Sequence, residues 1–307
     1  MLNSLFSDLN IPIQANAPMS DYTFTRTGGP AELLAFPETE SEVAALVQRA
    51  YQKQIPVTII GNASNLIIRD GGLAGLVILL TRIDDIRHEG LNLVASAGAP
   101  LMAVSEAAYQ FGLTGLEFAA GIPGSVGGAV FMNAGAYSGE VSDVITSINV
   151  LDERGNLRRI SGANLHFSYR HSVIQEQVLT VLSATFALRP GERRTIRQKM
   201  DELNAARASH QPLELPSCGS VFKRPPDHYT APLIREAGLQ GKIIGGAQVS
   251  LKHAGFIVNI DQATATDYLR LIALIQQTVW AKFQVRLETE VRIIGREPET
   301  ISAQNAE

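Results

Sequence analysis

The sequence predicts an α+β fold built from two helix-and-strand units and a third, smaller one. Of its 307 residues 45% are hydrophobic and 18% charged, a composition typical of globular proteins with room for two or three domains. Apolar residues follow helical spacing in some segments and form short β-branched runs in others. The glycine-containing loop at 61–65 leads into another apparent strand instead of opening a helix, which argues against a Rossmann fold.

The first unit contains a helix followed by short strands. Thr39 and Glu42 have capping-box spacing, and apolar residues recur at helical intervals over 39–50, which predicts an amphipathic helix. A strand is expected at 56–60. The apolar runs at 66–68 and 76–80 flank a turn at 70–72 and predict two more strands.

The second unit is expected to be rich in strands. A hairpin is predicted around 91–97, followed by a helix over 100–111 with Pro100 at its first position and Gly112 at its end. Strands at 144–151 and 157–160 flank a turn at 154–156, and another strand covers 178–188.

The third unit begins after a boundary near Pro190. A polar helix is predicted at about 193–209, and it cannot continue through the following prolines. A helix at 231–237, a strand at 256–260, a long helix with Thr264 as N-cap, and a strand over 287–294 complete the chain.

Composition excludes several functional classes. The chain has 26 basic and 30 acidic residues and a net charge of −4, so it lacks the basic field of a nucleic-acid binder. No apolar run reaches the ~20 residues of a membrane helix, and residues 1–16 do not resemble a secretory signal. Cys218 is the only cysteine, and the histidines show no metal-binding spacing. We therefore expect a cytoplasmic protein without metal or disulfides.

Two segments have the composition of phosphate-binding loops. Residues 61–65 read GNASN directly after a strand, and residues 121–140 contain six glycines. Small residues let backbone amides approach an anion. Each segment also has a structural interpretation, a plain β-turn for the first and a packing corner for the second. Two such segments suggest a dinucleotide such as FAD, bound non-covalently because neither contains histidine or cysteine.

Three isolated residues could support catalysis, although each has a more ordinary interpretation. Arg170 could bind a carboxylate through two parallel hydrogen bonds, but a lone arginine usually forms a surface ion pair. Ser220 could pass a proton, but it also suits a turn. Glu288 and Glu290 should share one strand face, either facing solvent or facing a cleft. A buried Glu290 should have a raised pKa or a basic partner.

Six motifs in order resemble the UDP-N-acetylenolpyruvoylglucosamine reductase family. They are GNASN at 61–65, GIPGSVGGAVFMNAGAYSGE at 121–140, SYRHS at 168–172, PSCGSVFKRP at 216–225, GGAQVSLKHAGFIVN at 245–259 and LETEVRIIG at 287–295. The resemblance covers nearly the whole chain and matches the compact type that lacks a tyrosine-bearing insertion.

The resemblance implies a fold and a reaction. The fold is the two-subdomain FAD-binding fold of the vanillyl-alcohol-oxidase (PCMH) type plus a smaller α+β substrate domain. This division gives subdomains at 1–80 and 81–190, a C-terminal strand at 287–297 returning to the second, and a UDP-sugar domain at 191–286. The reaction is the NADPH-driven reduction of UDP-N-acetylglucosamine enolpyruvate to UDP-N-acetylmuramate, a step of peptidoglycan synthesis that supports cell shape and division.

The resemblance also implies roles for individual residues. Hydride would leave flavin N5, Ser220 would deliver the proton, and Arg170 and Glu290 would polarise the carboxylate. Substrate or nucleotide contacts would come from Tyr169, Arg207, Gln211, Lys223 and Arg224. FAD contacts would come from Gly61, Asn62, Ala63, Ser64, Asn65, Gly121, Ile122, Pro123, Gly124, Ser125, Gly127, Gly128, Asn133, Ala134 and Gly135.

Two positions depart from the family pattern. Ala63 replaces a glycine often found there, so we expect its amide to be reachable without a positive φ. Arg224 stands where some members have asparagine. We expect a monomer or weak oligomer. Two alternatives stay open: another FAD oxidoreductase, for instance an oxidase using O2, and a flavin- or nucleotide-binding regulatory protein without catalysis.

Overall fold

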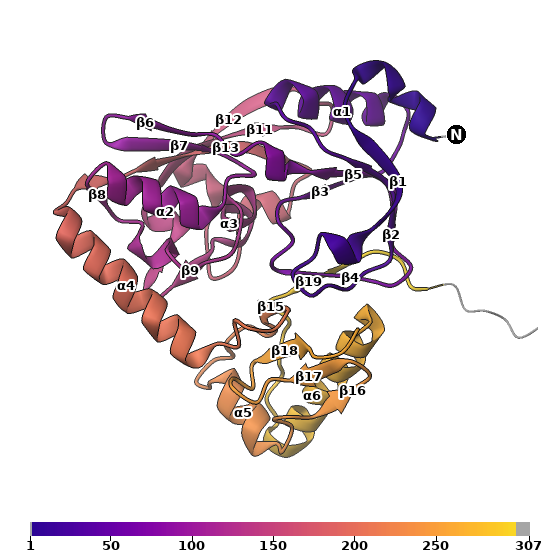
Figure 1. The fold of residues 1–307 in the computed structure, drawn as a ribbon, viewed down its shortest axis with the longest axis vertical. Helices are drawn as coiled ribbons and strands as arrows, with labels where there is room; N and C mark the ends of the chain where they lie inside the picture. The colour runs from indigo at the N-terminus through magenta and orange to yellow at the C-terminus, as the bar shows by residue number, and fades with distance from the viewer. Residues whose placement is uncertain (1, 299–307) are drawn as a thin grey trace, which may run out of the picture. The chain divides into compact units, whose positions relative to one another are not determined.

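The computed structural model describes residues 2–298 and has the α+β content predicted from the sequence. Its α-helices are α1 (Glu40–Gln52), α2 (Leu101–Gln110), α3 (Val126–Met132), α4 (Arg193–His210), α5 (Thr230–Glu236) and α6 (Ala265–Phe283) (Figure 1). The described residues form two compact units, the first comprising 2–14, 33–63 and 75–211, the second 15–32, 64–74 and 212–298.

The strands form several small sheets. Their bounds are β1 (Ile13–Pro18), β2 (Pro30–Ala35), β3 (Val57–Ile60), β4 (Leu66–Ile68), β5 (Leu73–Leu79), β6 (Ile86–Glu89), β7 (Asn92–Ser96), β8 (Leu113–Thr114), β9 (Gly135–Ala136), β10 (Gly139–Glu140), β11 (Ile145–Leu151), β12 (Leu157–Ser161), β13 (Thr180–Ala187), β14 (Arg189–Pro190), β15 (Ser217–Ser220), β16 (Ile243–Ile244), β17 (Ala247–Val249), β18 (Phe256–Asn259) and β19 (Arg292–Ile294). A four-stranded sheet has the order β1-β2-β5-β3, in which β3 and β5 are parallel.

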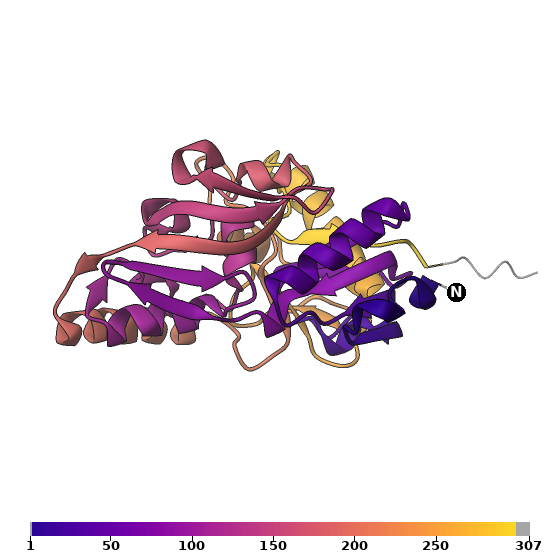
Figure 2. The same ribbon diagram turned by 90° about the horizontal axis from the view of Figure 1, so that it is seen from above.

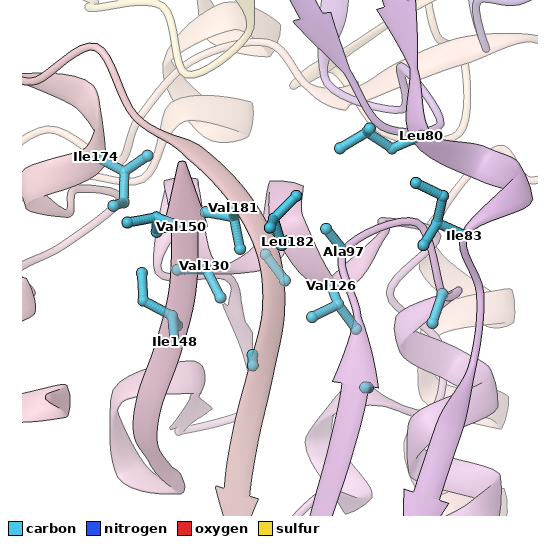
Figure 3. Close-up of a cluster of buried hydrophobic side chains, with 14 of the residues drawn as sticks. Leu80, Ile83, Ala97, Val126, Val130, Ile148, Val150, Ile174, Val181 and Leu182 are labelled. Atoms are coloured by element: carbon cyan, nitrogen blue, oxygen red, sulfur yellow. The ribbon is translucent and has the colours of Figure 1, made fainter. Parts of the chain in front are cut away.

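A five-stranded antiparallel sheet, in the order β12-β11-β13-β7-β6, organises the first unit. The short helix α3 packs on it. Val130 lies among side chains of β11 and β13, and Val126 lies beside Ala97 (Figure 3). Val126 and Val130 are both 0% exposed, and each such burial contributes about 1.5–3 kcal/mol. The core of the first unit therefore fixes the helix inside the glycine-rich segment.

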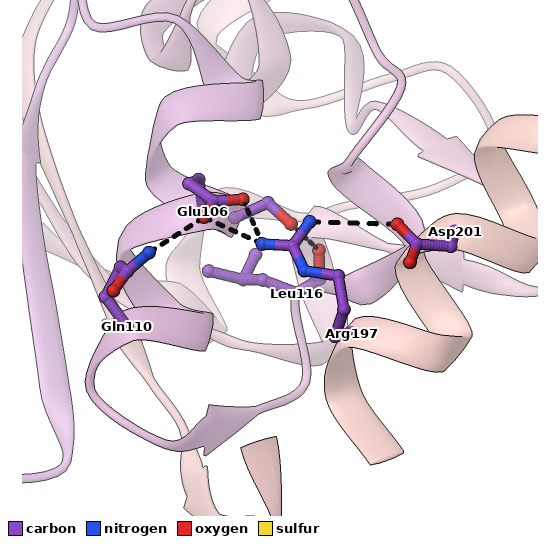
Figure 4. A network of polar contacts seen from close by, with 6 residues as sticks. Glu106, Gln110, Leu116, Arg197 and Asp201 are labelled. Carbon is purple, nitrogen blue, oxygen red and sulfur yellow. Dashed lines mark hydrogen bonds and ion pairs between the residues drawn. The ribbon is translucent and has the colours of Figure 1, made fainter. Parts of the chain in front are cut away.

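An ion-pair network joins α4 to α2 (Figure 4). Arg197 donates to both carboxylate oxygens of Glu106, at 2.7 and 2.6 Å, and its guanidinium carbon lies 4.0 Å from the centre of the Tyr109 ring. Seen from above, α4 runs alongside α2 (Figure 2). This contact holds α4 in the first unit.

The second unit has its own sheet and core. Its four-stranded antiparallel sheet has the order β15-β18-β17-β16, and α6 packs against it with Tyr268 fully buried. Asp70 accepts hydrogen bonds from the N–H groups of Ala265 and Thr266, at 2.9 and 2.8 Å, at the start of α6. β19 pairs in parallel with β4, which lies within residues 1–80, so the prediction that the C-terminal strand returns to the subdomain at 81–190 is wrong.

Most helices begin and end near their predicted positions. Thr264 and Asp267 form the capping box at the start of α6, and Thr39 caps α1. The helix predicted over 100–111 begins one residue later, with Pro100 as its N-cap, because proline's extended ψ of 129° lies outside the helix. The strand predicted over 287–294 is wrong before residue 292, where only an isolated bridge pairs Phe222 with Thr289. The division into domains at 1–80, 81–190 and 191–286 stays a prediction.

Candidate functional site

The segment GNASN joins β3 to β4. Ala63 has a φ of 53°, so the expectation that its amide is reachable without a positive φ is wrong. This left-handed residue costs about 1–2 kcal/mol in an L-amino acid. The N–H groups of Asn62, Ala63 and Ser64 donate to no acceptor within residues 2–298. Consecutive amides around a left-handed residue form a concave site for an anion.

The glycine-rich segment is partly helical. Its residues 126–132 form α3, and Ser125 caps the helix by accepting from the Gly128 N–H at 3.4 Å. The N–H groups of Val126 and Gly127 donate to carbonyls of residues 99 and 97, so they are not available to a ligand. The N–H groups of Gly124 and Ser125 have no acceptor in the described part of the chain.

The two segments contact each other in the first unit. The Asn62 side chain donates from Nδ2 to the Pro123 carbonyl at 2.6 Å. A Cβ at Gly61 would lie 2.1 Å from Ser125 Oγ, which shows how closely the backbones approach. The unpartnered backbone N–H groups of Asn62 and Ala63 therefore belong to one set with those of Gly124 and Ser125. Such a set of donors fits the diphosphate of a dinucleotide such as FAD.

Packing also explains some of the glycines. A Cβ at Gly127 would lie 3.1 Å from Ala97 Cβ, and one at Gly121 would lie 2.7 Å from Asn204 Oδ1 on α4. The packing-corner interpretation thus holds at these two positions. It does not account for the unpartnered amides.

The C-terminal end of α4 carries two of the predicted contact residues. A Cβ at Gly121 would lie 3.0 Å from Arg207 Cδ, which places Arg207 beside the glycine-rich segment. Arg207 Nε and Gln211 Oε1 are buried and have no hydrogen-bond partner in the described structure. Burial lowers the pKa of the Arg207 guanidinium. A buried, unpartnered donor and acceptor mark a position where the protein alone does not satisfy its polar groups.

Arg170 lies at the tip of a tight turn. Ser168 and His171 exchange backbone hydrogen bonds of 3.2 and 3.1 Å, and Arg170 between them has a φ of 57°. Its Nη2 donates to the Gly135 carbonyl at 3.0 Å, and its guanidinium lies over the Tyr169 ring at 5.1 Å. Arg170 is therefore tethered to the end of the predicted flavin-binding segment.

Asn133 serves a structural purpose that the sequence analysis did not identify. It adopts a φ of 42° after α3 and is 0% exposed. Its Nδ2 donates to the Ser168 carbonyl at 3.1 Å, and its Oδ1 accepts from the Ser142 N–H at 3.0 Å. Its side chain links the glycine-rich segment to the turn that carries Arg170.

Ser220 and Glu290 are both in the second unit. Ser220 ends β15, and the Glu290 N–H donates to the carbonyl of the next residue, Val221, at 2.8 Å. Both side chains are half-buried. Asn65 of the GNASN segment donates from Nδ2 to the Glu290 carbonyl at 3.2 Å. These bonds fix the backbone beside both candidate catalytic side chains.

The two carboxylates of the LETE segment differ in environment. Glu288 is exposed and its Oε2 lies 3.5 Å from Lys223 Nζ, whereas Glu290 is half-buried. The sequence pattern predicted that both carboxylates lie on one strand, but residues 288 and 290 are not part of a regular strand. Arg224 lies over the Tyr229 ring at 4.0 Å and donates from Nε to the His228 carbonyl at 3.3 Å. Both predicted basic contacts thus already have protein partners.

Cys218 is a buried core residue. It is 2% exposed, and burial raises the pKa of its thiol to about 12. Within residues 2–298, no group of three or more histidine, cysteine or carboxylate side chains is placed to hold a metal ion. The helices of the same residues include none with the length and hydrophobicity needed to span a membrane.

The predicted site residues are divided between the two units. The first unit contains Gly61, Asn62, Ala63, the residues from 121 to 135, Tyr169, Arg170, Arg207 and Gln211. The second contains Ser64, Asn65, Ser220, Lys223, Arg224 and Glu290.

The sequence and the structure are both similar to known reductases. A family model for the C-terminal domain of UDP-N-acetylenolpyruvoylglucosamine reductase matches residues 211–294, and a model for an FAD-binding domain matches 31–161. The UDP-N-acetylenolpyruvoylglucosamine reductase of Latilactobacillus sakei is 62% identical over 295 residues, which is 96% of this chain and 97% of the relative. That of Pediococcus pentosaceus is 59% identical over 287 residues, covering 94% and 96%.

A solved structure extends the similarity to the fold. The crystal structure of UDP-N-acetylenolpyruvylglucosamine reductase from Thermus caldophilus matches with a TM-score of 0.80 and 33% identity. The match covers 92% of this chain and 98% of that one.

Proposed function

This chain belongs to the UDP-N-acetylenolpyruvoylglucosamine reductase family, and we propose that Arg170, Ser220 and Glu290 carry its reaction. It is an FAD-dependent oxidoreductase of peptidoglycan synthesis that reduces the enolpyruvyl group of a UDP-sugar. NADPH is the electron donor that fits this reaction. In our proposal the product is UDP-N-acetylmuramate and the enzyme acts in the cytoplasm as a monomer or weak oligomer.

The cofactor-binding residues of the proposal are the two joined segments. Bound FAD, once it has been reduced by NADPH, would supply the hydride that adds to the vinyl carbon of the substrate. The unpartnered N–H groups of Asn62, Ala63, Gly124 and Ser125 would hold its diphosphate. No covalent link is required, because the segments contain no histidine or cysteine.

Arg170 and Glu290 would stabilise the charge that develops during reduction. Addition of hydride to the enolpyruvyl group builds negative charge on the carbon beside the carboxylate and on the carboxylate itself. The arginine fork matches a carboxylate with two parallel N–H donors. The half-buried Glu290 would hold the same carboxylate through a shared proton or hydrogen bond.

Ser220 would deliver the proton to that carbon. One observation supports this assignment: the 2.8 Å bond from the Glu290 N–H to the Val221 carbonyl joins the backbone segments that carry the two half-buried side chains. General acid catalysis requires this kind of positioning. The UDP moiety would be held by Tyr169, Arg207, Gln211, Lys223 and Arg224.

Anaerobic visible spectra test the function. The purified protein is reconstituted with FAD, then NADPH is added, then UDP-N-acetylglucosamine enolpyruvate. We expect NADPH to bleach the flavin absorbance and the enolpyruvyl sugar to restore it. A flavin that NADPH does not bleach would contradict the reductase and favour an oxidase or a binding protein.

Separate half-reactions test the role of Ser220. Ser220→Ala should leave reduction by NADPH intact and slow reduction of the sugar by roughly 10²-fold or more, because a positioned proton donor is lost. Ser217→Ala, on the same strand β15, is the matched control and should leave both rates unchanged. Equal losses in both half-reactions of Ser220→Ala would exclude it as the proton donor.

A further inference from the structure

We propose that Gln175 is a positioning residue for Arg170, in an inference that rests on the proposed function. Gln175 follows the turn of Arg170 and is half-buried. Its Nε2 donates to the Phe131 carbonyl at 2.8 Å and to the Arg170 carbonyl at 3.0 Å. One amide thus uses both of its hydrogens to join the last turn of α3 to the backbone of Arg170.

The backbone of Arg170 needs such support. Its φ of 57° lies in the left-handed region, which an arginine rarely adopts. A residue persists in this conformation only where its surroundings fix it. The carbonyl of Arg170 is held by Gln175, and its guanidinium is held by the Gly135 carbonyl at 3.0 Å. Both ends of Arg170 are therefore tied to the segment 131–135.

This arrangement relates Arg170 to the flavin-binding segment. Residues 131 to 135 directly continue the segment that begins at Gly121 and contains the free amides of Gly124 and Ser125. A displacement of about 1 Å between a substrate-binding group and the reacting centre can cost 10²-fold in rate. Gln175 would keep the carboxylate-binding arginine at a fixed position relative to the segment that holds FAD.

Ser172 provides a matched comparison. Its Oγ donates to the same Phe131 carbonyl at 2.9 Å and is 0% exposed, but no bond from its side chain reaches the Arg170 carbonyl in the described structure. Loss of this hydroxyl removes a neighbouring hydrogen bond of the same kind. A merely structural role for Gln175 predicts similar effects at both positions.

The experiment compares Gln175→Leu with Ser172→Ala in the FAD-loaded enzyme. We expect Gln175→Leu to slow reduction of UDP-N-acetylglucosamine enolpyruvate about 10- to 100-fold. Reduction by NADPH and the Kd for FAD, measured by flavin fluorescence, should change less than about threefold. Ser172→Ala should change none of these by more than about threefold. Equal effects of the two variants, or an intact substrate rate in Gln175→Leu, would overturn the inference.

A double-mutant cycle tests whether Gln175 acts through Arg170. Arg170→Lys combined with Gln175→Leu should be no slower than Arg170→Lys alone, because the interaction being positioned is already lost. Multiplicative losses would show independent roles. If Gln175→Leu does not fold, Gln175→Glu replaces it. Its substrate rate relative to wild type should recover in part at low pH, because the protonated carboxyl offers one of the two hydrogens that the amide uses. A pH-independent ratio would count against the inference.

The same measurements separate this inference from the function itself. A wild-type enzyme whose reduced flavin is not reoxidised by the enolpyruvyl sugar contradicts the proposed function. A wild-type enzyme that reacts normally, with multiplicative losses in the cycle, contradicts only the role of Gln175.

Discussion

Gly61→Ala tests whether the two proposed FAD segments depend on their close approach. Gly61 does not have a positive φ, so alanine is acceptable to its backbone and any effect is steric. The added Cβ would lie 2.1 Å from Ser125 Oγ and 3.1 Å from Ser125 Cβ. The first distance is impossible, so the Ser125 hydroxyl has to rotate away.

The cost follows from what that hydroxyl does. Ser125 caps α3, and loss of a serine N-cap costs ~1 kcal/mol. The remaining Cβ–Cβ approach requires a shift of a few tenths of an ångström in a residue that is 1% exposed, which raises the total to about 1–2 kcal/mol. We expect this loss in the free energy of unfolding. If the same shift separates the unpartnered N–H groups of the two segments, the Kd for FAD rises roughly 5- to 30-fold.

Denaturant unfolding of the apo-protein and FAD titration by fluorescence measure the two effects. Ser125→Gly serves as the control, since glycine is a tolerated N-cap and should cost only a few tenths of a kcal/mol. The double variant Gly61→Ala with Ser125→Gly removes the clash and should regain most of the FAD affinity. Unchanged FAD affinity in Gly61→Ala, or no rescue in the double variant, would refute the reasoning.

Two further predictions concern contacts within single units. Asp70→Ala should lower the free energy of unfolding by about 2 kcal/mol. Asp70 accepts from the N–H groups of Ala265 and Thr266 at the start of α6, and its negative charge interacts favourably with the helix dipole. Asp70→Asn keeps an acceptor and should lower the free energy of unfolding by less. A change below ~0.5 kcal/mol in chemical denaturation would reject this role. Arg197 lowers the pKa of Glu106 below its ordinary value of 4.5. The ion pair between them therefore stabilises the folded state above pH 4.5, and this stabilisation is lost as the pH falls. Glu106→Gln should therefore cost roughly 0.5 kcal/mol at pH 7, a value reduced by solvent screening, and less near pH 3. Equal costs at both pH values would disprove the ion-pair explanation.

The sequence alone determined the features that depend on neighbouring residues. Thr39 and Thr264 identified the starts of α1 and α6, because an N-cap and its partner lie within one turn. The six motifs identified the family, since their order and residue types are independent of how the chain folds. The fold class followed from both.

Only the tertiary structure decided which distant groups meet. Several contacts bring together groups that are distant in the sequence, and each of them involves a backbone carbonyl or a backbone pairing. They are the bond of Asn62 to Pro123, the pairing of β19 with β4, and the bonds of Gln175 to Phe131 and Arg170. Backbone carbonyls carry no residue signature, so a side chain that binds one is invisible in the sequence pattern. The irregular backbone over 287–291 was missed for a related reason. Alternation of apolar and polar residues predicts two faces, but the available partner strand decides whether a strand forms.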